Sequence, residues 1–546
     1  MKKFSKILSV ALLVALVLSL GVANAFAEET TTTPSTITVK NVITSTSIEG
    51  REFKAYKIFD AVYGDGDAVS YTIKSDSYYY KTAAVKAILD EYFTFTASAS
   101  DRTVFVVAAK DNLTAESVRT LADALDDAIP STDNGKANGG SNQQAVISVP
   151  GPGYYLVTGS VKSKVDADRT AETAIALVAV KDAAEVNAKG DIPDLKKEIT
   201  AVKEAGTAIN GALLDDAGKA AVAKVGSVVE YKLTSKVPDL TGYSAYTYTF
   251  TDTMSTGLTF NEDVAVYVGG STTALANDKV AYNKVGNGFT LTIPYDTLKE
   301  LATGATVEVK YSATVNESAL QYDYEKNTAK LTYSDNPGDD STHDTPDQET
   351  YVIDINVDVN KYTGTDPATG TKLANAEFKL FKGTERSGNV FYKWDATAGE
   401  GKGKVTWVAE ADADVFKTGD NGKLTTQIRG LDKGTYSLLE VTAPSGYNLL
   451  PAPVEFTISV VESQDHKTVT YSSNPGTVTM GEKQSGVINL GADHETQPVD
   501  TIDVLNQSGT QLPSTGGIGT TIFYVVGGVL VLAAIILLVT KKRMSE

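Results

Sequence analysis

The chain consists largely of short runs in which apolar residues alternate with polar ones, the pattern of β-strands that bury one face. AYTYTFTD (245–252) and TVEVKYSATV (306–315) are two such runs, rich in Thr, Tyr and Val, and Gly, Asn, Asp and Pro separate the runs from one another. Helical periodicity is confined to the first third, in residues 78–93 and 113–129, where Thr114 is placed to cap a helix. The sequence therefore predicts an all-β protein with helical insertions near its start.

Two turn-rich breaks divide this pattern, NAKGDIPDLKKEI (187–199) and SDNPGDDSTHDTPDQETYVID (334–354). A chain of 546 residues is also too long for one hydrophobic core. Short strands with regular turn signals are typical of immunoglobulin-like sandwiches. We predict three such β-sandwich domains in tandem, at residues 28–188, 189–347 and 348–507.

Both composition and the N-terminus indicate an exported protein. A basic start, an apolar stretch and small residues at the end predict a signal peptide over residues 1–27, with an uncleaved anchor helix as the alternative. The net charge of -19 argues against nucleic acid as a partner. Cysteine is absent, so the exported domains need some stabilising device other than disulfides.

The C-terminal segment, residues 508–546, combines three features in a fixed order. A short motif comes first, then 22 uncharged residues from Ile518 to Val539, long enough to span a bilayer, and then a basic tail that favours the cytoplasmic side. The motif is Leu512, Pro513, Ser514, Thr515 and Gly516.

This arrangement resembles the LPXTG cell-wall sorting signal of Gram-positive bacteria. The resemblance implies that a sortase cleaves between Thr515 and Gly516, holds the threonine carbonyl as a thioester, and passes it to an amine. The chain would then be a substrate of acyl transfer, anchored to peptidoglycan. Its three histidines lie in polar, turn-like segments without metal-ligand or nucleophile–base spacing, so we predict no enzyme, metal or cofactor.

In the third predicted domain, three strands direct one polar residue each to their apolar side. A buried ammonium without a partner is costly, so such a lysine calls for an explanation. The three inward sets are Val357, Val359 and Lys361; Tyr436, Leu438 and Glu440; and Ile502, Val504 and Asn506.

Two interpretations fit this arrangement. One is a buried Lys–Glu ion pair hydrogen-bonded by asparagine. In the other, desolvation lowers the lysine pKa and raises the glutamate pKa, so that the neutral amine of Lys361 attacks the side-chain carbonyl of Asn506. Glu440 shuttles the protons, and ammonia leaves. The product is an isopeptide bond.

YSLLEVTAPSGY (436–447) resembles the E-box of Gram-positive pilins and collagen-adhesin B-type (CnaB-type) domains, with Val441 where threonine is usual. VNKYTG, which contains Lys361, likewise resembles the opening strand of such a domain. The resemblance implies that Lys361 is the nucleophile and Glu440 the proton shuttle.

The second predicted domain repeats the pattern with Lys197 at its start, Asp252 in the middle and Asn327 near its end, each sharing parity with apolar neighbours. Lys196 faces the other way, and a capping role is the alternative for Asp252. The first domain differs, because Thr158 stands where the glutamate is expected and the run TAIALVAV that closes it lacks asparagine. We predict no isopeptide bond there.

The chain thus resembles sortase-assembled backbone pilins, which join a lysine near the end of the first domain to the next subunit. Here Lys189 is the first choice for that lysine and Lys181 the alternative, although the usual aromatic and proline residues are missing around them. We predict a shaft subunit polymerised head to tail, together with tip or accessory pilins and host ligands as further partners. The alternative is a wall-anchored adhesin or accessory pilin that is not polymerised.

Overall fold

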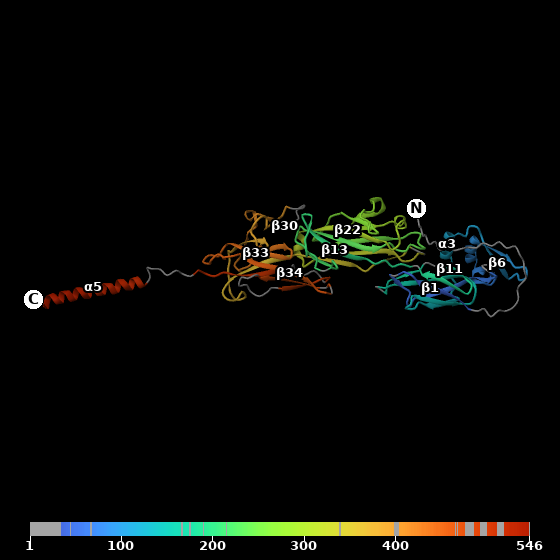
Figure 1. Cartoon of the computed structure of the whole chain (residues 1–546), viewed down its shortest axis with the longest axis horizontal. Coiled ribbons are helices and arrows are strands. Elements are labelled where there is room, and N and C mark those ends of the chain that lie inside the picture. Colours follow the sequence, from blue (N-terminus) through green and yellow to red (C-terminus); the bar gives the residue numbers. More distant parts are fainter. Residues whose placement is uncertain are drawn as a thin grey trace, which may run out of the picture. The chain divides into compact units, whose positions relative to one another are not determined.

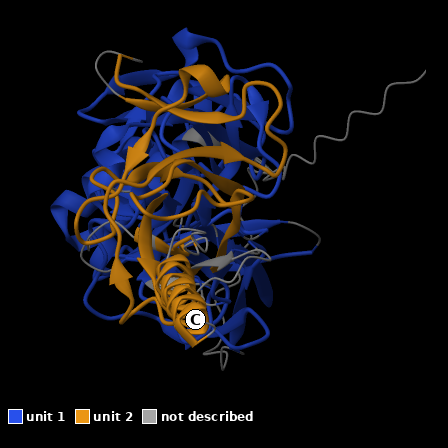
Figure 2. Ribbon diagram, turned by 90° about the vertical axis from the view of Figure 1, so that its left-hand side faces the viewer, with its two compact units in different colours: residues 1–354, 462–469, 488–497 blue, residues 355–461, 470–487, 498–546 orange. Residues whose placement is uncertain are grey.

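The computed structural model of the chain describes residues 34–544, except 44, 66–67, 165–166, 174–175, 189, 215, 338–339, 398–402, 465, 467, 476–484, 492–498 and 510–517. β-Sheets make up most of it (Figure 1). It divides into two compact units, residues 1–354 with 462–469 and 488–497, and residues 355–461 with 470–487 and 498–546 (Figure 2). The predicted signal peptide 1–27, the motif 512–516 and Lys189 lie outside the described residues.

The first described strand of unit 1 lies in the middle of a small sheet. That strand, β1 (Ser35–Asn41), pairs in parallel with β12 (Ala183–Ala188) and antiparallel with β8 (Gln144–Val149). A larger sheet contains the long strands β3 (Glu52–Tyr63) and β9 (Gly153–Ser163). Its other described members are β2 (Thr46–Ser47), β4 (Val69–Lys74), β5 (Phe93–Ala97), β6 (Val104–Ala109), β7 (Gly135–Asn138), β10 (Thr170–Glu172) and β11 (Ala176–Val180).

The predicted helical insertions are confirmed in this part of the chain, as α1 (Tyr78–Lys81), α2 (Ala83–Tyr92) and α3 (Ala115–Asp126). Thr114 caps α3, because its hydroxyl accepts the backbone N–H of Ser117. Leu89 and Leu121 from two of these helices are buried in one cluster with Phe59 of β3. The helices therefore cover an apolar face of the larger sheet.

The second sheet pair of unit 1 carries one of the predicted lysine sites. One sheet contains β13 (Lys196–Glu204), β16 (Val228–Lys236) and β22 (Thr306–Val315), and the other contains β17 (Tyr248–Met254) and β23 (Glu325–Ser334). The remaining described elements are β14 (Thr207–Ala208), β15 (Ala220–Val222), β18 (Leu258–Phe260), β19 (Ala265–Val268), η1 (Asn277–Lys279), β20 (Ala281–Lys284), β21 (Gly288–Thr292), α4 (Tyr295–Leu298), η2 (Glu317–Gln321), β24 (Thr342–Asp344) and β25 (Gln348–Ile353).

Two details of this sheet pair differ from the expectation. Strand β25 pairs with β23, so the second sheet pair extends to Ile353, beyond the predicted boundary after residue 347. The acidic, turn-rich segment before β25 suggested a linker, but its backbone continues the sheet instead. The short helix α4 (Tyr295–Leu298) also lies beyond the first third of the chain, in a region for which the sequence predicts no helix.

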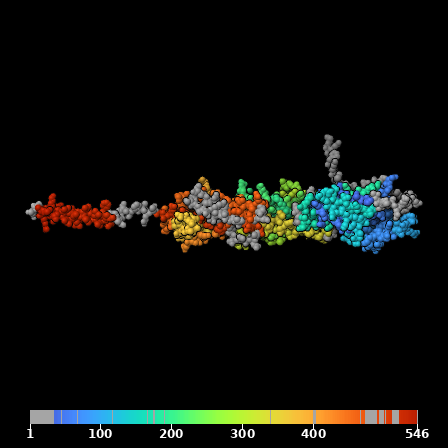
Figure 3. Space-filling view, turned by 90° about the horizontal axis from the view of Figure 1, so that it is seen from below, coloured from blue at the N-terminus to red at the C-terminus, as the bar shows by residue number. Residues whose placement is uncertain are grey.

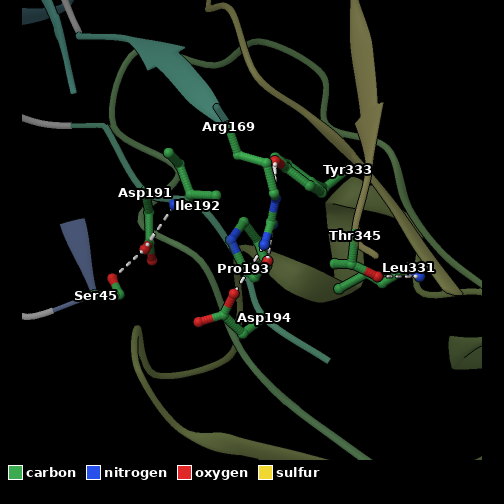
Figure 4. A network of polar contacts seen from close by, with 9 residues as sticks. All are labelled: Ser45, Arg169, Asp191, Ile192, Pro193, Asp194, Leu331, Tyr333 and Thr345. Carbon is green, nitrogen blue, oxygen red and sulfur yellow. Dashed lines mark hydrogen bonds and ion pairs between the residues drawn. The ribbon is translucent and has the colours of Figure 1, made fainter. Parts of the chain in front are cut away.

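A polar network joins the two sheet pairs of unit 1 (Figure 4). Arg169 donates to the carbonyl oxygen of Pro193 at 2.5 Å, to Asp194 at 2.9 Å and to the hydroxyl of Tyr333 at 3.2 Å. Nearby, Ser45 donates to Asp191 at 2.9 Å, and burial raises the pKa of that carboxyl. Side chains of the first sheet pair therefore fix the connecting segment, and Arg169 also links it to Tyr333 of the second.

Unit 2 is centred on β26 (Ile355–Thr363), which pairs in parallel with the last strand, β37 (Val499–Leu505), and antiparallel with β32 (Ile428–Leu431). In a second sheet, β33 (Gly434–Thr442) pairs with β28 (Glu377–Lys382). The other described elements of the C-terminal part are β27 (Thr371–Lys372), β29 (Phe391–Asp395), β30 (Lys404–Val408), η3 (Glu410–Asp412), β31 (Phe416–Lys417), β34 (Val454–Glu462), β35 (Thr468–Pro475) and β36 (Ser485–Asn489).

Helix α5 (Ile518–Met544) forms where the apolar C-terminal segment predicts it. Within Thr520–Met544 the most apolar stretch of 18 residues has a mean hydropathy of 3.0, and none of that stretch is buried (red in Figure 3). By length and composition this helix is able to span a membrane.

Candidate functional sites: two buried lysines

The first site lies in unit 2, where the first and last strands of the predicted third domain are neighbours. Lys361 of β26 is opposite Val504 of β37, and its side chain is fully buried. Asn506 follows directly after β37 and donates its backbone N–H to the carbonyl oxygen of Tyr362 at 2.9 Å. The parallel pairing of the two strands therefore brings the lysine and the asparagine together.

The side chains of this site form the cluster that the sequence predicts. The Nζ of Lys361 donates to Oδ1 of Asn506 and lies 2.9 Å from Oε1 of Glu440. That same carboxylate oxygen accepts from Nδ2 of Asn506 at 3.2 Å. The other oxygen of Glu440 accepts the backbone N–H of Leu450 at 2.9 Å, which fixes the carboxylate. One carboxylate oxygen thus contacts both nitrogen atoms.

The surroundings of the lysine favour its neutral form. Burial lowers the pKa of Lys361 from 10.5 to about 8, against the opposing effect of Glu440. The ring of Phe378 lies 5.2 Å from the ammonium and, like Glu440, favours the charged form. The backbone carbonyl of Asn448 accepts from the Asn506 amide at 3.2 Å. The amine is therefore held against an amide carbonyl in a low-dielectric environment.

The second site lies between the two sheets of the second sheet pair. Lys197 comes from β13 in one sheet, whereas Asp252 and Asn327 come from β17 and β23 in the other. All three residues are buried, with exposed fractions of at most 1%. Lys196 is on the opposite face, its side chain 58% exposed, as its parity predicts.

The contacts of this site include a residue that the sequence analysis missed. The Nζ of Lys197 lies 2.5 Å from Oδ2 of Asp252 and 2.9 Å from the hydroxyl of Tyr311. That hydroxyl donates to the same carboxylate oxygen at 2.5 Å and accepts from Nδ2 of Asn327 at 3.4 Å. Tyr311 shares inward parity with Val307 and Val309 on β22, so its buried hydroxyl was a signal that it needs a polar partner.

Burial dominates the electrostatics of the second site as well. It lowers the pKa of Lys197 to about 8 and raises the pKa of the Asp252 carboxyl. Burial also raises the pKa of the Tyr311 hydroxyl well above its usual value. The amine and the acid are therefore both shifted toward their neutral forms, while the phenol keeps its proton.

The first domain has no glutamate at the position equivalent to Glu440. That position, however, is not Thr158, the residue that the sequence predicts. The hydroxyls of Tyr155 and Tyr436 each donate to the carbonyl oxygen four residues earlier, at 2.7 and 3.0 Å. Glu440 follows the second tyrosine by four residues, and Gly159 follows the first by the same number. A Cβ at Gly159 would lie 2.2 Å from the ring of Phe53. The packing therefore leaves no room for a side chain.

The terminal strands of the first domain also differ from those of the third. The inward parity of β1 runs through Ile37 and Val39 to Asn41 instead of to a lysine. The run TAIALVAV contributes β11, which pairs with β9, and the last strand is β12. The asparagine of that strand, Asn187, is exposed. Within the described residues of this domain, no lysine, acid and asparagine meet as they do at the other two sites.

Of the two lysines considered for linkage between subunits, only Lys181 is described. It is exposed, between β11 and β12, and its Nζ lies 5.6 Å from the ring centre of Tyr63. Among the described residues there is no group of three or more His, Cys, Asp or Glu placed to hold a metal ion.

Comparison with protein families gives three matches along the chain. Residues 225–337 match the Gram-positive pilin backbone subunit 2, Cna-B-like domain, and residues 357–475 match a prealbumin-like fold domain. Residues 505–546 match the LPXTG cell wall anchor motif. The chain is a Gram-positive backbone pilin. The pilin is a structural subunit of a cell-surface pilus shaft, anchored to the cell wall.

Individual relatives of the pilin are distant. It is 26% identical over 412 residues to the trypsin-resistant surface T6 protein of Streptococcus pyogenes serotype M6, covering 65% of this chain and 70% of that protein. The structure of the T6 backbone pilin of serotype M6 S. pyogenes matches 87% of this chain and 99% of its own, at 17% identity and a TM-score of 0.49. The major pilin SpaD of Corynebacterium diphtheriae matches 87% and 98%, at 17% identity and a TM-score of 0.42.

Proposed function

We propose that this pilin is polymerised head to tail by a sortase, and that Lys361–Asn506 and Lys197–Asn327 isopeptide bonds staple its second and third domains. The domains are those of the sequence analysis, 28–188, 189–347 and 348–507, with the second extended to residue 353. The observation that carries the proposal is the contact of the buried Lys361 amine with the Asn506 carbonyl, beside Glu440. For the second bond the supporting observation is the burial of Lys197, Asp252 and Asn327 around the hydroxyl of Tyr311.

The condensation balances without a cofactor. Glu440 takes one proton from the Lys361 ammonium, and the neutral amine attacks the side-chain carbon of Asn506. The carboxylic acid then gives its proton to the amide nitrogen, the carbon–nitrogen bond breaks, and ammonia leaves. The carboxylate takes the second proton from the new amide nitrogen. Asp252 has the same role for Lys197 and Asn327.

Each bond would stabilise its domain by restricting the unfolded chain. The Lys361–Asn506 bond closes 145 residues and the Lys197–Asn327 bond closes 327 − 197 = 130 residues. Both loops correspond to about 5 kcal/mol by the chain-entropy relation used for disulfides. Such bonds also explain how an exported chain without cysteine resists pulling.

Polymerisation would use the sorting motif and a lysine of another copy. Cleavage after Thr515 leaves an acyl group that an amine of Lys189, or alternatively Lys181, attacks. A link from the end of one copy to the side of the next is heterologous, so it propagates as a filament. The last copy would be transferred to peptidoglycan, and tip or accessory pilins and host ligands would be further partners.

The test is a blot of the cell-wall fraction after boiling in SDS. The proposal predicts a ladder of high-mass species that is lost in K189A and retained in K181A, the matched control. Loss in K181A alone would move the linkage to that lysine. A single wall-linked band from the unaltered chain would contradict polymerisation and leave a wall-anchored adhesin or accessory pilin.

A further inference from the structure

The two sites differ in how the carboxylate reaches the amide that must leave. At the site in unit 2, Oε1 of Glu440 contacts both Lys361 Nζ and Asn506 Nδ2. At the site in unit 1, Oδ2 of Asp252 contacts the lysine, and Nδ2 of Asn327 donates to the hydroxyl of Tyr311. Aspartate is one methylene shorter than glutamate, and the hydroxyl of Tyr311 contacts both Asp252 and Asn327.

We propose that the hydroxyl of Tyr311 is a proton relay between Asp252 and the leaving amide nitrogen of Asn327. The inference rests on the proposed isopeptide bond and adds a catalytic residue to it. The hydroxyl is suited to this role because it touches every reacting group of the site. It donates its one proton to Asp252 and accepts from both Lys197 and Asn327.

The ring of Tyr311 is held in place by aromatic neighbours. It stacks on Tyr231 with ring centres 5.4 Å apart and meets Phe289 edge-on at 5.0 Å. Tyr311 itself is 3% exposed. A phenol fixed in this way costs little reorganisation when protons move through it.

The proton transfers balance through the hydroxyl. Asp252 takes one proton from the Lys197 ammonium, and the neutral amine attacks the side-chain carbon of Asn327. Tyr311 then gives its proton to the amide nitrogen and recovers one from the Asp252 carboxylic acid. Ammonia leaves, and the carboxylate takes the second proton from the new amide. The phenol ends as it began.

The protonation state of the phenol agrees with this sequence of steps. Burial raises the pKa of Tyr311 well above its usual value, so the hydroxyl is neutral and able to donate at the start. An ionised phenolate beside Asp252 would instead place two negative charges together.

The experiment compares Y311F with Y248F in the full-length chain, made in a host without sortase. Tyr248 is a matched control, because it is buried in the same sheet pair and its hydroxyl donates to the Lys236 carbonyl at 2.9 Å. Newly made protein is labelled in a short pulse during synthesis, and cross-linked tryptic peptides are quantified against time in the chase that follows. We expect the Lys197–Asn327 peptide to form at least about a hundredfold more slowly in Y311F and at the unaltered rate in Y248F.

A second variant separates proton transfer from packing. In the double variant D252E/Y311F the longer carboxylate should reach the amide directly, as Glu440 does, and restore the cross-link. Formation of the cross-link at the normal rate in Y311F would overturn the relay. The relay would also be overturned if Y311F became sensitive to trypsin and the added D252E change did not restore the cross-link. Absence of the peptide from the unaltered chain would instead refute the proposed bond itself. The Lys361–Asn506 peptide serves as an internal standard in every sample.

Discussion

The two lysine sites of this pilin bring the same functional groups together on different scaffolds. In unit 1, Lys197 faces Asp252 and Asn327 across the space between two sheets. In unit 2, Lys361 lies on β26 and Asn506 directly follows its parallel neighbour β37, while Glu440 comes from the other sheet. In unit 2 the amine contacts the amide oxygen directly. In unit 1 the amine contacts the carboxylate and the hydroxyl of Tyr311, and that hydroxyl contacts the amide.

The difference has a mechanical consequence. A bond between β26 and the residue after β37 would connect the first and last strands of the third domain, so that tension passes directly from one strand to the other. A bond from β13 to β23 would join two sheets and prevent their separation, although β25 follows after the bonded strand. The two proposed bonds would therefore restrict different motions at a similar entropic gain.

The largest expected effect is that of E440A. It removes the proton shuttle and leaves the buried Lys361 without its carboxylate, so unit 2 should lose at least about 5 kcal/mol of unfolding free energy. Denaturant unfolding measures this, with E455A, an exposed glutamate of β34, as the control. A cross-linked Lys361–Asn506 peptide in E440A would be incompatible with the assigned role.

N327A should have the next largest effect. The bond is lost, but the lysine keeps its contacts with Asp252 and Tyr311, so the cost is that of the chain entropy alone, about 5 kcal/mol. The control is N283A, on the exposed strand β20. Equal unfolding free energies of N327A and N283A would show that no bond forms between the sheets.

The pH dependence of N327A gives a smaller effect of defined sign. The uncondensed Lys197 has a pKa of about 8 when folded and 10.5 when unfolded, so the unfolded chain binds more protons between these values. The penalty for the buried ammonium is present below pH 8 and is relieved by about 3 kcal/mol as the pH rises to 10.5. The unaltered chain, whose nitrogen is an amide, should not show this gain. Identical pH profiles for the two proteins would argue against the bond.

The smallest effects concern the tyrosines that mark equivalent positions in the first and third domains. Y155F removes a hydrogen bond to the Gly151 carbonyl, at a cost of about 1 kcal/mol. Y436F also removes the hydrogen bond to the Asp432 carboxylate, so its cost should be about 2 kcal/mol. The Lys361–Asn506 peptide should still form fully in Y436F, since the hydroxyl donates toward Asp432. A loss of cross-linking in Y436F would show that the hydrogen bond of Tyr436 positions Glu440.

Much of both sites was predictable because alternation in sequence reports one-sided burial. Lys197, Lys361 and their partners all occupy inward positions that their apolar neighbours define. Other features left no such pattern. Strand β26 is buried on both faces, where Asn356 and Asp358 accept backbone N–H groups of distant residues.

The other features that the sequence did not predict depend on which strands become neighbours in the fold. The equivalence of Gly159 to Glu440 emerges from the hydrogen bonds of two tyrosines rather than from the spacing of similar residues. Tyr311 meets Asp252 only because β22 and β17 face each other from opposite sheets. Sequence parity gives the face of a strand but not what lies across from it.

The central claim is that both buried amines have condensed with asparagine. The most direct test is the intact mass of the full-length chain from a host without sortase, with the N-terminus of the same sample determined by sequencing. We predict a mass about 34 Da below that calculated from the sequence, the loss of two ammonia molecules, with each peptide pair found joined. A mass equal to the calculated value would contradict the account.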